Sequence, residues 1–549
     1  MSKKYVIGVD FGTLSARAVL FELATGEEVA ESVFSYPHGV MDRELPCGKR
    51  LPPKFALQHP QDYVDALKHV VGGVLANTDP AEVGALGLDF TTCTLLPVDE
   101  NLTPLCMKEK WTREPHAYVK LWKHHGAVEE AEQFDRVAQE RKEPWMDIYG
   151  NRSSSEWMFP KIMETLHHAP AVYEETFRFL EAADWLDWLM TGQETHNASM
   201  AGLKSHWNKE TGYPSDEFLT AVDPGLKGIV GTKVAKEVQL VDQIAGTLNE
   251  QGAAMTGLPV GTPVALPLVD ANAALAGLNI TQEGDMMLIM GTSSCHITNT
   301  KKPVAVPGAS GYVDNGMLPG LCTIEAGQAG VGDCFDWFTH YCVPQSYTAE
   351  AEGRGISIHA LLREKAQKLQ PGESRLLALD WWSGNRSVLK KDNLTGMILG
   401  LNMQTRPEEI YRALIEATAY GTRMIIENYE NHGIPVTGIC AAGGIAQKDP
   451  MMMQIYADVT GREIRVGHTT QAAARGIAMY AAVAAGAFDD VLQAAAQYAR
   501  EPLTTYRPVK ENQQTYEALY QEYRILHDYF GRGGNRVMER LDAIAGKQD

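Results

Sequence analysis

Several features that would place a protein in a class at once are missing from these 549 residues. No apolar run reaches the ~20 residues that a membrane-spanning helix needs, since the longest weakly polar stretch is 476–488. The first residues carry two lysines but no apolar segment followed by a cleavage site, so they do not resemble a secretory signal. The eight cysteines are scattered, without a CxxC pair or a zinc-ligand spacing. We therefore expect a cytoplasmic protein whose thiols are free.

Positive charge is also scarce, because the 49 Lys and Arg residues are outnumbered by 69 Asp and Glu residues, which gives a net charge of −20. Nucleic acids and anionic membranes are bound by concentrated basic faces, so this balance argues against both as partners. The hydrophobic share of 44% is ordinary for a folded protein. At ~100–200 residues per domain, the length predicts more than one core, most simply two large domains.

Two similar segments occur in opposite halves of the chain. In 5–21, an apolar run, a turn with Asp10, Gly12 and Thr13, and a second alternating run predict a β-hairpin. Residues 286–297 repeat the pattern around another Gly-Thr pair. They lie too far apart for a solenoid repeat, so they indicate two related domains in tandem.

The remaining pattern predicts mixed α/β layers, with the domain boundary near 270–283. The segment 472–487 is rich in small residues and suits close helix packing. The tail beyond 492 is helical and polar, and we expect it to pack back on the body. Apolar spacing predicts helices at 62–76, 157–166, 177–189, 408–429, 450–460 and 472–487, and strands at 83–90 and 438–442.

A Gly-Thr turn presents backbone N–H groups and a hydroxyl to an anion, which suits the oxygens of a polyphosphate. One such turn is weak evidence, but two turns in tandem domains could face each other and hold one nucleotide from both sides. The common alternatives are absent, because the chain has no GxxxxGK[ST] loop, no GxGxxG loop and no protein-kinase motif set.

Longer motifs give a specific resemblance. They are DFGTLSAR at 10–17, PLVDANAALAG around Asp270, MGTSSCHIT at 290–298 and AAGGIAQKDPMMMQIYADVTG at 441–461. Over nearly its whole length the chain resembles the FGGY carbohydrate kinases, a family of the actin-like (ribonuclease-H-like) ATPase superfamily. The resemblance implies an α/β fold with two actin-like domains in tandem and a deep cleft between them. Residues 1–278 would bind the sugar and carry the catalytic aspartate, and residues 279–549 would bind the nucleotide and end in a helical tail.

The same resemblance implies MgATP-dependent phosphorylation of a sugar. Asp270 would be the general base that takes the proton of the sugar hydroxyl, and Asp10 would hold Mg²⁺ partly through waters. Gly12 and Thr13 would face the γ-phosphate. The remaining nucleotide-binding positions would be Gly291 and Thr292 at the other phosphates, and Gly332, Gly443, Gly444 and Lys448 along the ribose and base.

For the sugar, the stretches at 89–99, 201–207 and 325–338 resemble the branch of the family that phosphorylates L-ribulose at its 5-hydroxyl for arabinose breakdown. The implied pocket contains Thr92, Lys204, Asp270 and Glu325, since hydroxyl groups are recognised by dense, charge-assisted donors and acceptors. The chain departs from many relatives at Asn272, where they carry His, and at Ala329 and Gly330.

Other interpretations stay open at this point. A kinase for D-ribulose, ribitol or L-xylulose would use the same fold, and a nucleotide-switched actin-like ATPase would need neither Lys204 nor Glu325, which could form an ion pair. Asp270 also suits a helix N-cap, a role compatible with catalysis. Trp381 and Trp382 could stack on sugar or pack in a core. We expect the paired histidines at 124–125 and 167–168 to be solvated, and family habit favours a homodimer.

Overall fold

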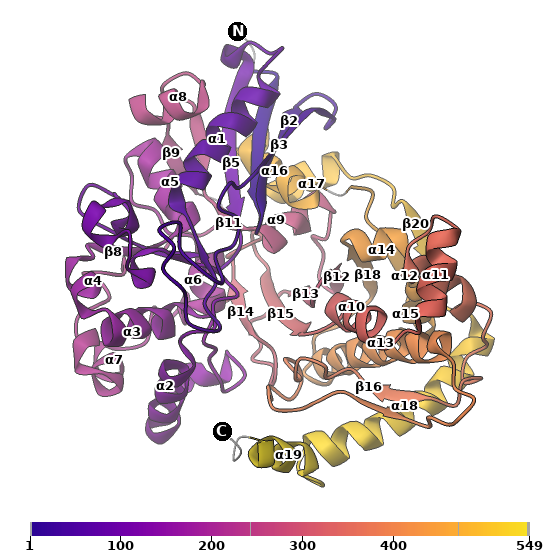
Figure 1. Ribbon diagram of the computed structural model, residues 1–549. Helices are drawn as coiled ribbons and strands as arrows, with labels where there is room; N and C mark the ends of the chain where they lie inside the picture. Colours follow the sequence, from indigo (N-terminus) through magenta and orange to yellow (C-terminus); the bar gives the residue numbers. More distant parts are fainter. Residues whose placement is uncertain (1–2, 242, 470, 546–549) are drawn as a thin grey trace.

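The computed structural model describes residues 3–241, 243–469 and 471–545, which form two lobes (Figure 1). The first lobe is built on a mixed sheet with the strand order β3-β2-β1-β5-β10-β9, and β11 pairs with β5. Its strands are β1 Tyr5–Phe11, β2 Ser15–Glu22, β3 Glu28–Ser35, β5 Val83–Phe90, β9 Ile244–Thr247, β10 Pro263–Ala265 and β11 Leu268–Val269.

The second lobe repeats this arrangement in the order β14-β15-β13-β12-β18-β19-β20. In each lobe a hairpin comes first (β1–β2 or β12–β13), and its first strand pairs in parallel with a later strand, β5 or β18. The predicted duplication is therefore visible in the topology. The strands are β12 Asp285–Met290, β13 Ser294–Thr300, β14 Gly311–Asp314, β15 Cys322–Gln328, β18 Gly438–Ala442, β19 Ile464–Val466 and β20 Thr504–Tyr506.

Helices and two small sheets surround these two layers (Figure 1). The first lobe has α1 Pro60–Val74, α2 Val128–Arg141, α3 Met158–His168, α4 Pro170–Glu175, α5 Ala182–Thr191, α6 Ala198–Lys204, α7 Asp216–Val222, α8 Glu250–Thr256 and α9 Asp270–Gly277, with β4 Leu57–Gln58, β6 Leu95–Val98, β7 Val119–Lys120 and β8 Arg178–Glu181. The second has α10 Gly332–Tyr341, α11 Gln345–Gly353, α12 Ile358–Ala366, α13 Pro407–Asn431, α14 Gly444–Lys448, α15 Pro450–Thr460, α16 Ala472–Ala484, α17 Val491–Gln497, α18 Lys510–Gly531 and α19 Val537–Ala545, with β16 Leu377–Leu379 and β17 Met397–Leu399.

Most predicted elements are present, and β5, β18 and α15 have the predicted bounds. One expectation was wrong in part: the predicted helix 177–189 begins with strand β8 and becomes helical only at Ala182. Its first residues pair with β6, so a long-range partner overrides their local helical spacing. Helix α1 begins earlier than expected, because Pro60 suits the first turn and His59 caps it.

The lobes meet where α16 crosses β1, β5 and α9, as Figure 1 shows. This contact depends on glycine, because a Cβ at Gly476 would overlap the carbonyl oxygen of Ala273, and one at Gly277 would overlap that of Ala472. Gly8 on β1 meets Ala474 in the same way. The expectation that this small-residue helix packs closely is confirmed.

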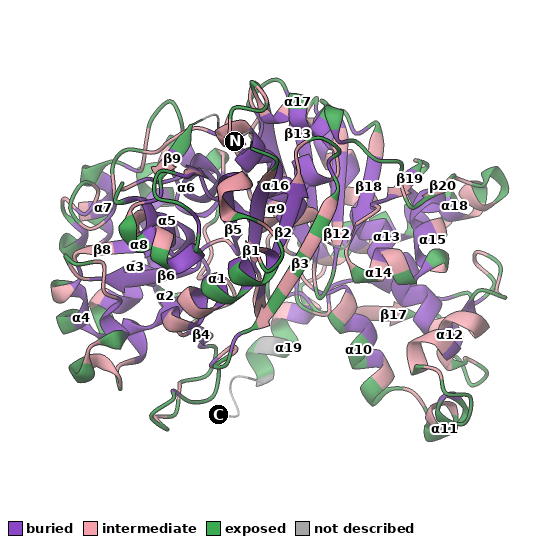
Figure 2. Ribbon diagram, turned by 90° about the horizontal axis from the view of Figure 1, so that it is seen from above, coloured by how far each residue is buried: buried purple, intermediate pink, exposed green. Residues whose placement is uncertain are grey.

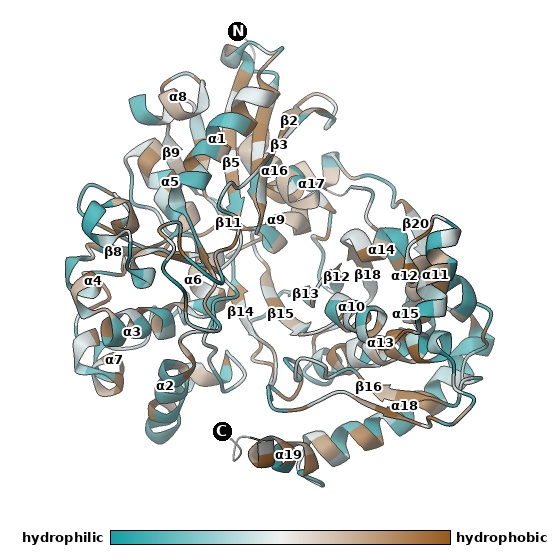
Figure 3. Ribbon diagram, viewed as in Figure 1, coloured by the Kyte–Doolittle hydropathy of each residue, from teal (hydrophilic) through white to brown (hydrophobic). Residues whose placement is uncertain are grey.

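Burial follows the sheets (Figure 2). All of β5 is buried, as expected of a strand covered on both faces, whereas the edge strand β3 alternates between half-buried and exposed residues. The central strands are correspondingly apolar (Figure 3).

The tail packs back on the second lobe as predicted, through the buried Tyr516, Tyr520 and Tyr523 on α18. Among the described residues, no helix has the length and apolar character needed to span a membrane.

Candidate active site

Three carboxylates gather where parallel strands of the first sheet end. Asp10 near the end of β1 lies beside Asp89 on β5, because the two residues are register partners. On the other side of β5, the two residues of β11 pair with Asp89 and Phe90, the last two residues of β5. Asp270 directly follows β11 and is the first residue of α9. Asp270 was predicted to suit an N-cap, but Val269 holds that position, and the Asp270 Oδ1 accepts the backbone N–H of Ala271 at 2.6 Å.

The three carboxyl groups share a strongly perturbed environment. Burial raises the pKa of Asp89 well above its usual value, and the charges of Asp10 and Asp270 raise it further. Burial also raises the pKa of Asp10, although the Arg17 guanidinium 3.6 Å away opposes this. Burial and the neighbouring Asp10 raise the pKa of Asp270 to about 7. A carboxylate with such a pKa can accept a proton near neutral pH.

Asp89 was not among the residues predicted from the sequence. It is fully buried, and both of its carboxylate oxygens lack a hydrogen-bond partner among the described residues. Unpaired buried carboxylate oxygens beside Asp10 form a set of hard oxygen donors, which is the chemistry that Mg²⁺ prefers. A signal existed in the sequence, since Asp89 is an isolated acidic residue in an otherwise apolar strand.

The first Gly-Thr turn closes the β1–β2 hairpin next to Asp10. Its backbone is fixed by a hydrogen bond from the Gly12 N–H to the Ser15 carbonyl oxygen at 3.0 Å. Thr13 is held from two other segments: the Gln58 amide donates to its carbonyl oxygen at 2.7 Å, and the Trp122 indole N–H donates to its Oγ1 at 3.1 Å.

The second turn, at Gly291 and Thr292 between β12 and β13, is supported by two helix N-termini. The Gly332 N–H at the start of α10 donates to the Gly291 carbonyl oxygen at 3.0 Å. Gly443 precedes α14 with φ of 94°, and a Cβ there would overlap the Met290 carbonyl oxygen. The structure therefore brings these predicted nucleotide residues together at the end of β12.

Gly444 and Lys448 lie on the exposed side of this group. Gly444 opens α14 and has open space around it, and Lys448 ends the same short helix with an exposed side chain. The backbone carbonyl oxygen of Lys448 accepts a hydrogen bond from Arg363. The contacts of the described residues do not join the Lys448 ammonium to the second turn.

The predicted sugar residues come from both lobes. Lys204 ends α6 and Glu325 lies on β15. Burial lowers the pKa of Lys204, but the carboxylates of Glu156 and Glu325 outweigh this effect and hold it above its usual value. The charges of Lys204 and Glu325 also act on Asp270, so the three groups are close to one another. The half-buried Thr92 follows β5, and its hydroxyl has no partner among the described residues.

Two further charged residues, which sequence reasoning missed, belong to this group. Glu156 precedes α3, and its carboxylate lies 3.8 Å from the Lys204 ammonium. Burial raises the pKa of Glu156, but Lys204 and Arg386 outweigh it and leave that pKa below the usual value. Arg386 lies against Gly327 on β15 and forms no hydrogen bond or close ion pair within the described part of the chain. Its guanidinium is therefore free to bind a ligand.

The loop that carries Thr92 is fixed by buried charges. The Lys161 ammonium donates to the Cys93 carbonyl oxygen at 2.7 Å and to that of Leu121 at 2.8 Å. The Glu181 carboxylate accepts the Thr94 backbone N–H at 2.9 Å. Hydrogen bonds to charged groups are stronger than neutral ones, so they hold the loop in place.

The structure corrects the expected surface position of His124 and places Trp381 in the core. His124 is fully buried and bonded to Glu164 at 2.9 Å, so it is not solvated. His125, His167 and His168 are exposed, as expected, and His167 lies between the carboxylates of Glu130 and Asp223. Trp381 is fully buried and packs against α18, so it belongs to the core.

Two related lobes contribute the residues of this candidate site, and comparisons identify the family of the chain. The N-terminal domain of the FGGY family of carbohydrate kinases matches residues 5–277, and its C-terminal domain matches residues 286–485. The chain belongs to the FGGY family of carbohydrate kinases. It is therefore an ATP-dependent sugar kinase.

Individual relatives match almost end to end. The chain is 48% identical over 538 residues to the ribulokinase of Bacillus licheniformis, with 97% of each chain covered. It is 44% identical to the ribulokinase of Mycolicibacterium smegmatis, covering 98% of this chain and 96% of that one. The fold is similar to the xylulose kinase of Rhodospirillum rubrum, with a TM-score of 0.79 at 21% identity, covering 95% and 98% of the two chains. The ADP-bound glycerol kinase of Plasmodium falciparum gives 0.73 at 14% identity, with the same coverage.

Proposed function

We propose that this chain is a ribulokinase that transfers the γ-phosphoryl group of ATP to the 5-hydroxyl of L-ribulose, giving L-ribulose 5-phosphate in L-arabinose breakdown. The observation that carries this proposal is the 44–48% identity to ribulokinases over at least 97% of the chain. The charged group around Lys204 and Glu325 supports it, because a polyhydroxylated substrate is bound by charge-assisted hydrogen bonds.

Asp270 is the general base of the proposed reaction. As the sugar 5-oxygen forms a bond to the γ-phosphorus, Asp270 takes the hydroxyl proton, and the bond from phosphorus to the bridging oxygen breaks so that ADP leaves with the electron pair. A pKa of about 7 matches this role at neutral pH. Lys204, Glu325 and Thr92 orient the sugar, and Glu156 holds the Lys204 ammonium.

The two Gly-Thr turns, at Gly12–Thr13 and Gly291–Thr292, bind phosphate oxygens through backbone N–H groups. Gly332, Gly443, Gly444 and Lys448 line the ribose and base. Asp10, together with Asp89, would hold Mg²⁺, which when bound neutralises charge on the phosphates. Exclusion of water by the two lobes protects ATP from hydrolysis.

The proposal also covers the roles of the two halves of the chain, its oligomeric state and its location. We assign sugar binding and the catalytic base to residues 1–278, and nucleotide binding with the helical tail to residues 279–549. We expect a homodimer, which light scattering coupled to size exclusion would measure. All eight cysteines are free thiols, which supports a cytoplasmic location.

The first test is a coupled ADP-release assay with MgATP against L-ribulose, D-ribulose, L- and D-xylulose, ribitol, L-arabitol and glycerol. We expect the highest kcat/KM with L-ribulose. A preference for another polyol would contradict the substrate assignment while leaving the kinase class intact. ADP release that no sugar stimulates would contradict the proposed reaction and favour a switch-type ATPase.

The pH dependence of the reaction tests the role of Asp270. Only the carboxylate form accepts a proton, so kcat/KM for the sugar should fall about tenfold per pH unit below the Asp270 pKa of about 7. The Lys204 charge lowers this pKa, so Lys204→Met should move the acid limb to higher pH. Lys209→Met, which removes a lysine paired with Asp314 at the surface, should leave the limb in place. An acid limb that stays fixed in Lys204→Met would contradict the assignment.

Arg386 provides a test of the sugar pocket from the second lobe. Because its guanidinium is free to bind a ligand, Arg386→Met should raise KM for the sugar about tenfold, the worth of one charged hydrogen bond, and leave KM for ATP nearly unchanged. Steady-state kinetics with each substrate varied in turn measure this split. Arg354→Met, at the surface end of α11, is the matched control. Equal changes in both KM values would argue against a sugar contact.

A further inference from the structure

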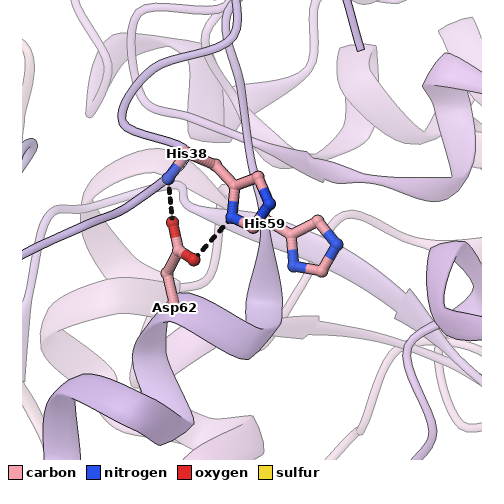
Figure 4. Close-up of side chains that lie close together, drawn as sticks. All are labelled: His38, His59 and Asp62. Carbon is pink, nitrogen blue, oxygen red and sulfur yellow. Dashed lines mark hydrogen bonds and ion pairs between the residues drawn. The ribbon is translucent and has the colours of Figure 1, made fainter. Parts of the chain in front are cut away.

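Two imidazoles and one carboxylate form a compact group outside the residues assigned to phosphoryl transfer (Figure 4). His38 follows β3, His59 caps the N-terminus of α1, and Asp62 lies in the first turn of that helix. The nitrogen and oxygen atoms that could serve as ligands all lie within 4.8 Å of one another.

The Asp62 carboxylate is the buried member of the group. Its side chain is 4% exposed, and its Oδ1 lies 2.7 Å from the His38 Nδ1. Its Oδ2 accepts the His38 backbone N–H at 3.1 Å. Within the described residues no lysine or arginine pairs with it, and His38 is its only side-chain partner. A buried carboxylate in this position favours a cation.

The two imidazoles lie next to each other, and one of them is open to solvent. Their rings stack with centroids 4.4 Å apart and an interplanar angle of 18°. An imidazole nitrogen is among the commonest ligands of transition-metal cations in proteins. His38 is 36% exposed, so a cation can reach the group from solvent.

We propose that His38, His59 and Asp62 bind a divalent transition-metal cation of the zinc, cobalt or nickel type. Two nitrogen ligands and one carboxylate favour such cations over Mg²⁺, which takes oxygen ligands and keeps its waters. Stacked rings do not aim their nitrogens at one point, so binding requires the His59 ring to leave the stack. We therefore expect weaker binding than at a closed four-ligand zinc site.

The group of His38, His59 and Asp62 is connected to the Gly12–Thr13 turn through two chain segments. Gln58, adjacent to His59, donates to the Thr13 carbonyl oxygen at 2.7 Å. Tyr36, two residues before His38, donates its backbone N–H to the Leu14 carbonyl oxygen at 2.9 Å. A cation that joins the two histidines thus ties together both segments that hold the turn, and it should change KM for ATP. This consequence rests on the proposed function, whereas cation binding itself does not.

Binding is tested by calorimetric titration of the full chain with Zn²⁺ in excess Mg²⁺. His38→Gln and His59→Gln should each bind one equivalent fewer than the unsubstituted protein. His38→Gln leaves the His59 cap of α1 in place, so it separates loss of a ligand from loss of the helix cap. His432→Gln, which removes a histidine bonded to the Asn428 carbonyl oxygen, should bind the full number. Equal numbers in all four proteins would overturn the proposal.

The connection to the turn is tested by initial rates at varied ATP, with and without saturating Zn²⁺. KM for ATP should change in the unsubstituted protein and not in His38→Gln. The same response in both would overturn the connection. A chain without sugar-dependent activity would instead contradict the proposed function, and the count of bound Zn²⁺ would still decide the site.

Discussion

Replacing Asp270 by asparagine is expected to lower kcat with L-ribulose by about 10²- to 10⁴-fold, the usual contribution of a general base. The amide keeps the shape of the side chain and still accepts the Ala271 N–H, so α9 should start unchanged. KM for ATP should therefore stay nearly the same. Single-turnover kinetics would show the loss in the chemical step itself.

Asp187→Asn is the matched control for this result. Asp187 on α5 is also fully buried, and its carboxylate has no partner among the described residues. Burial and the neighbouring Asp184 raise its pKa well above the usual value, and the amide keeps the shape of the side chain. Its turnover should match that of the unsubstituted protein. Comparable losses in the two variants would indicate a structural cause, and normal turnover in Asp270→Asn would remove Asp270 from the mechanism.

The second large effect concerns the contact between the lobes. Gly476→Ala would place a Cβ on the Ala273 carbonyl oxygen, and a backbone atom in the middle of a helix cannot move aside. We expect a loss of about 3 kcal/mol in the free energy of unfolding, at the upper end of ordinary overpacking. A thermal scan should show a lower melting temperature, and proteolysis near 278–284 should become faster.

Gly353→Ala adds the same methyl group at a position where it meets no other atom. Gly353 ends α11, and nothing lies within 4 Å of a Cβ built there. Alanine in a helix is favoured over glycine by about 1 kcal/mol, so this variant should melt at the same temperature or slightly higher. If Gly476→Ala melts like Gly353→Ala, the close approach of α9 and α16 is not important for stability.

Local patterns were enough to predict most of the architecture. The hairpins at Asp10 and Gly291, the strands at 83–90 and 438–442, and the small-residue helix α16 all follow from short-range spacing and turn chemistry. The helix predicted at 177–189 was wrong over its first residues, because they form a strand that pairs with β6. Such long-range pairing cannot be read from local spacing.

The site residues that the sequence did not predict are brought together by segments that lie far apart in the chain. Asp89 becomes a member of the carboxylate group only because β5 lies in register with β1. Glu156 and Arg386 stand in segments without periodicity, and folding from opposite lobes brings them to Lys204. His124 was expected at the surface as part of a polar run, yet it is buried and hydrogen-bonded to Glu164.

The position of Asp270 has a consequence for how the enzyme closes on its substrates. Asp270 opens α9, and α9 touches α16 backbone to backbone through Gly277 and Gly476. When two bodies rotate, atoms near the axis travel least, and glycine-mediated contact of this kind is where two helices can act as a pivot. If the lobes close about this contact, as the proposed exclusion of water requires, Asp270 stays almost stationary while the second lobe carries the Gly291–Thr292 turn and the phosphates proposed to bind there toward it. In the proposed reaction, such a closure would separate the alignment of Asp270 from the motion that admits sugar and nucleotide.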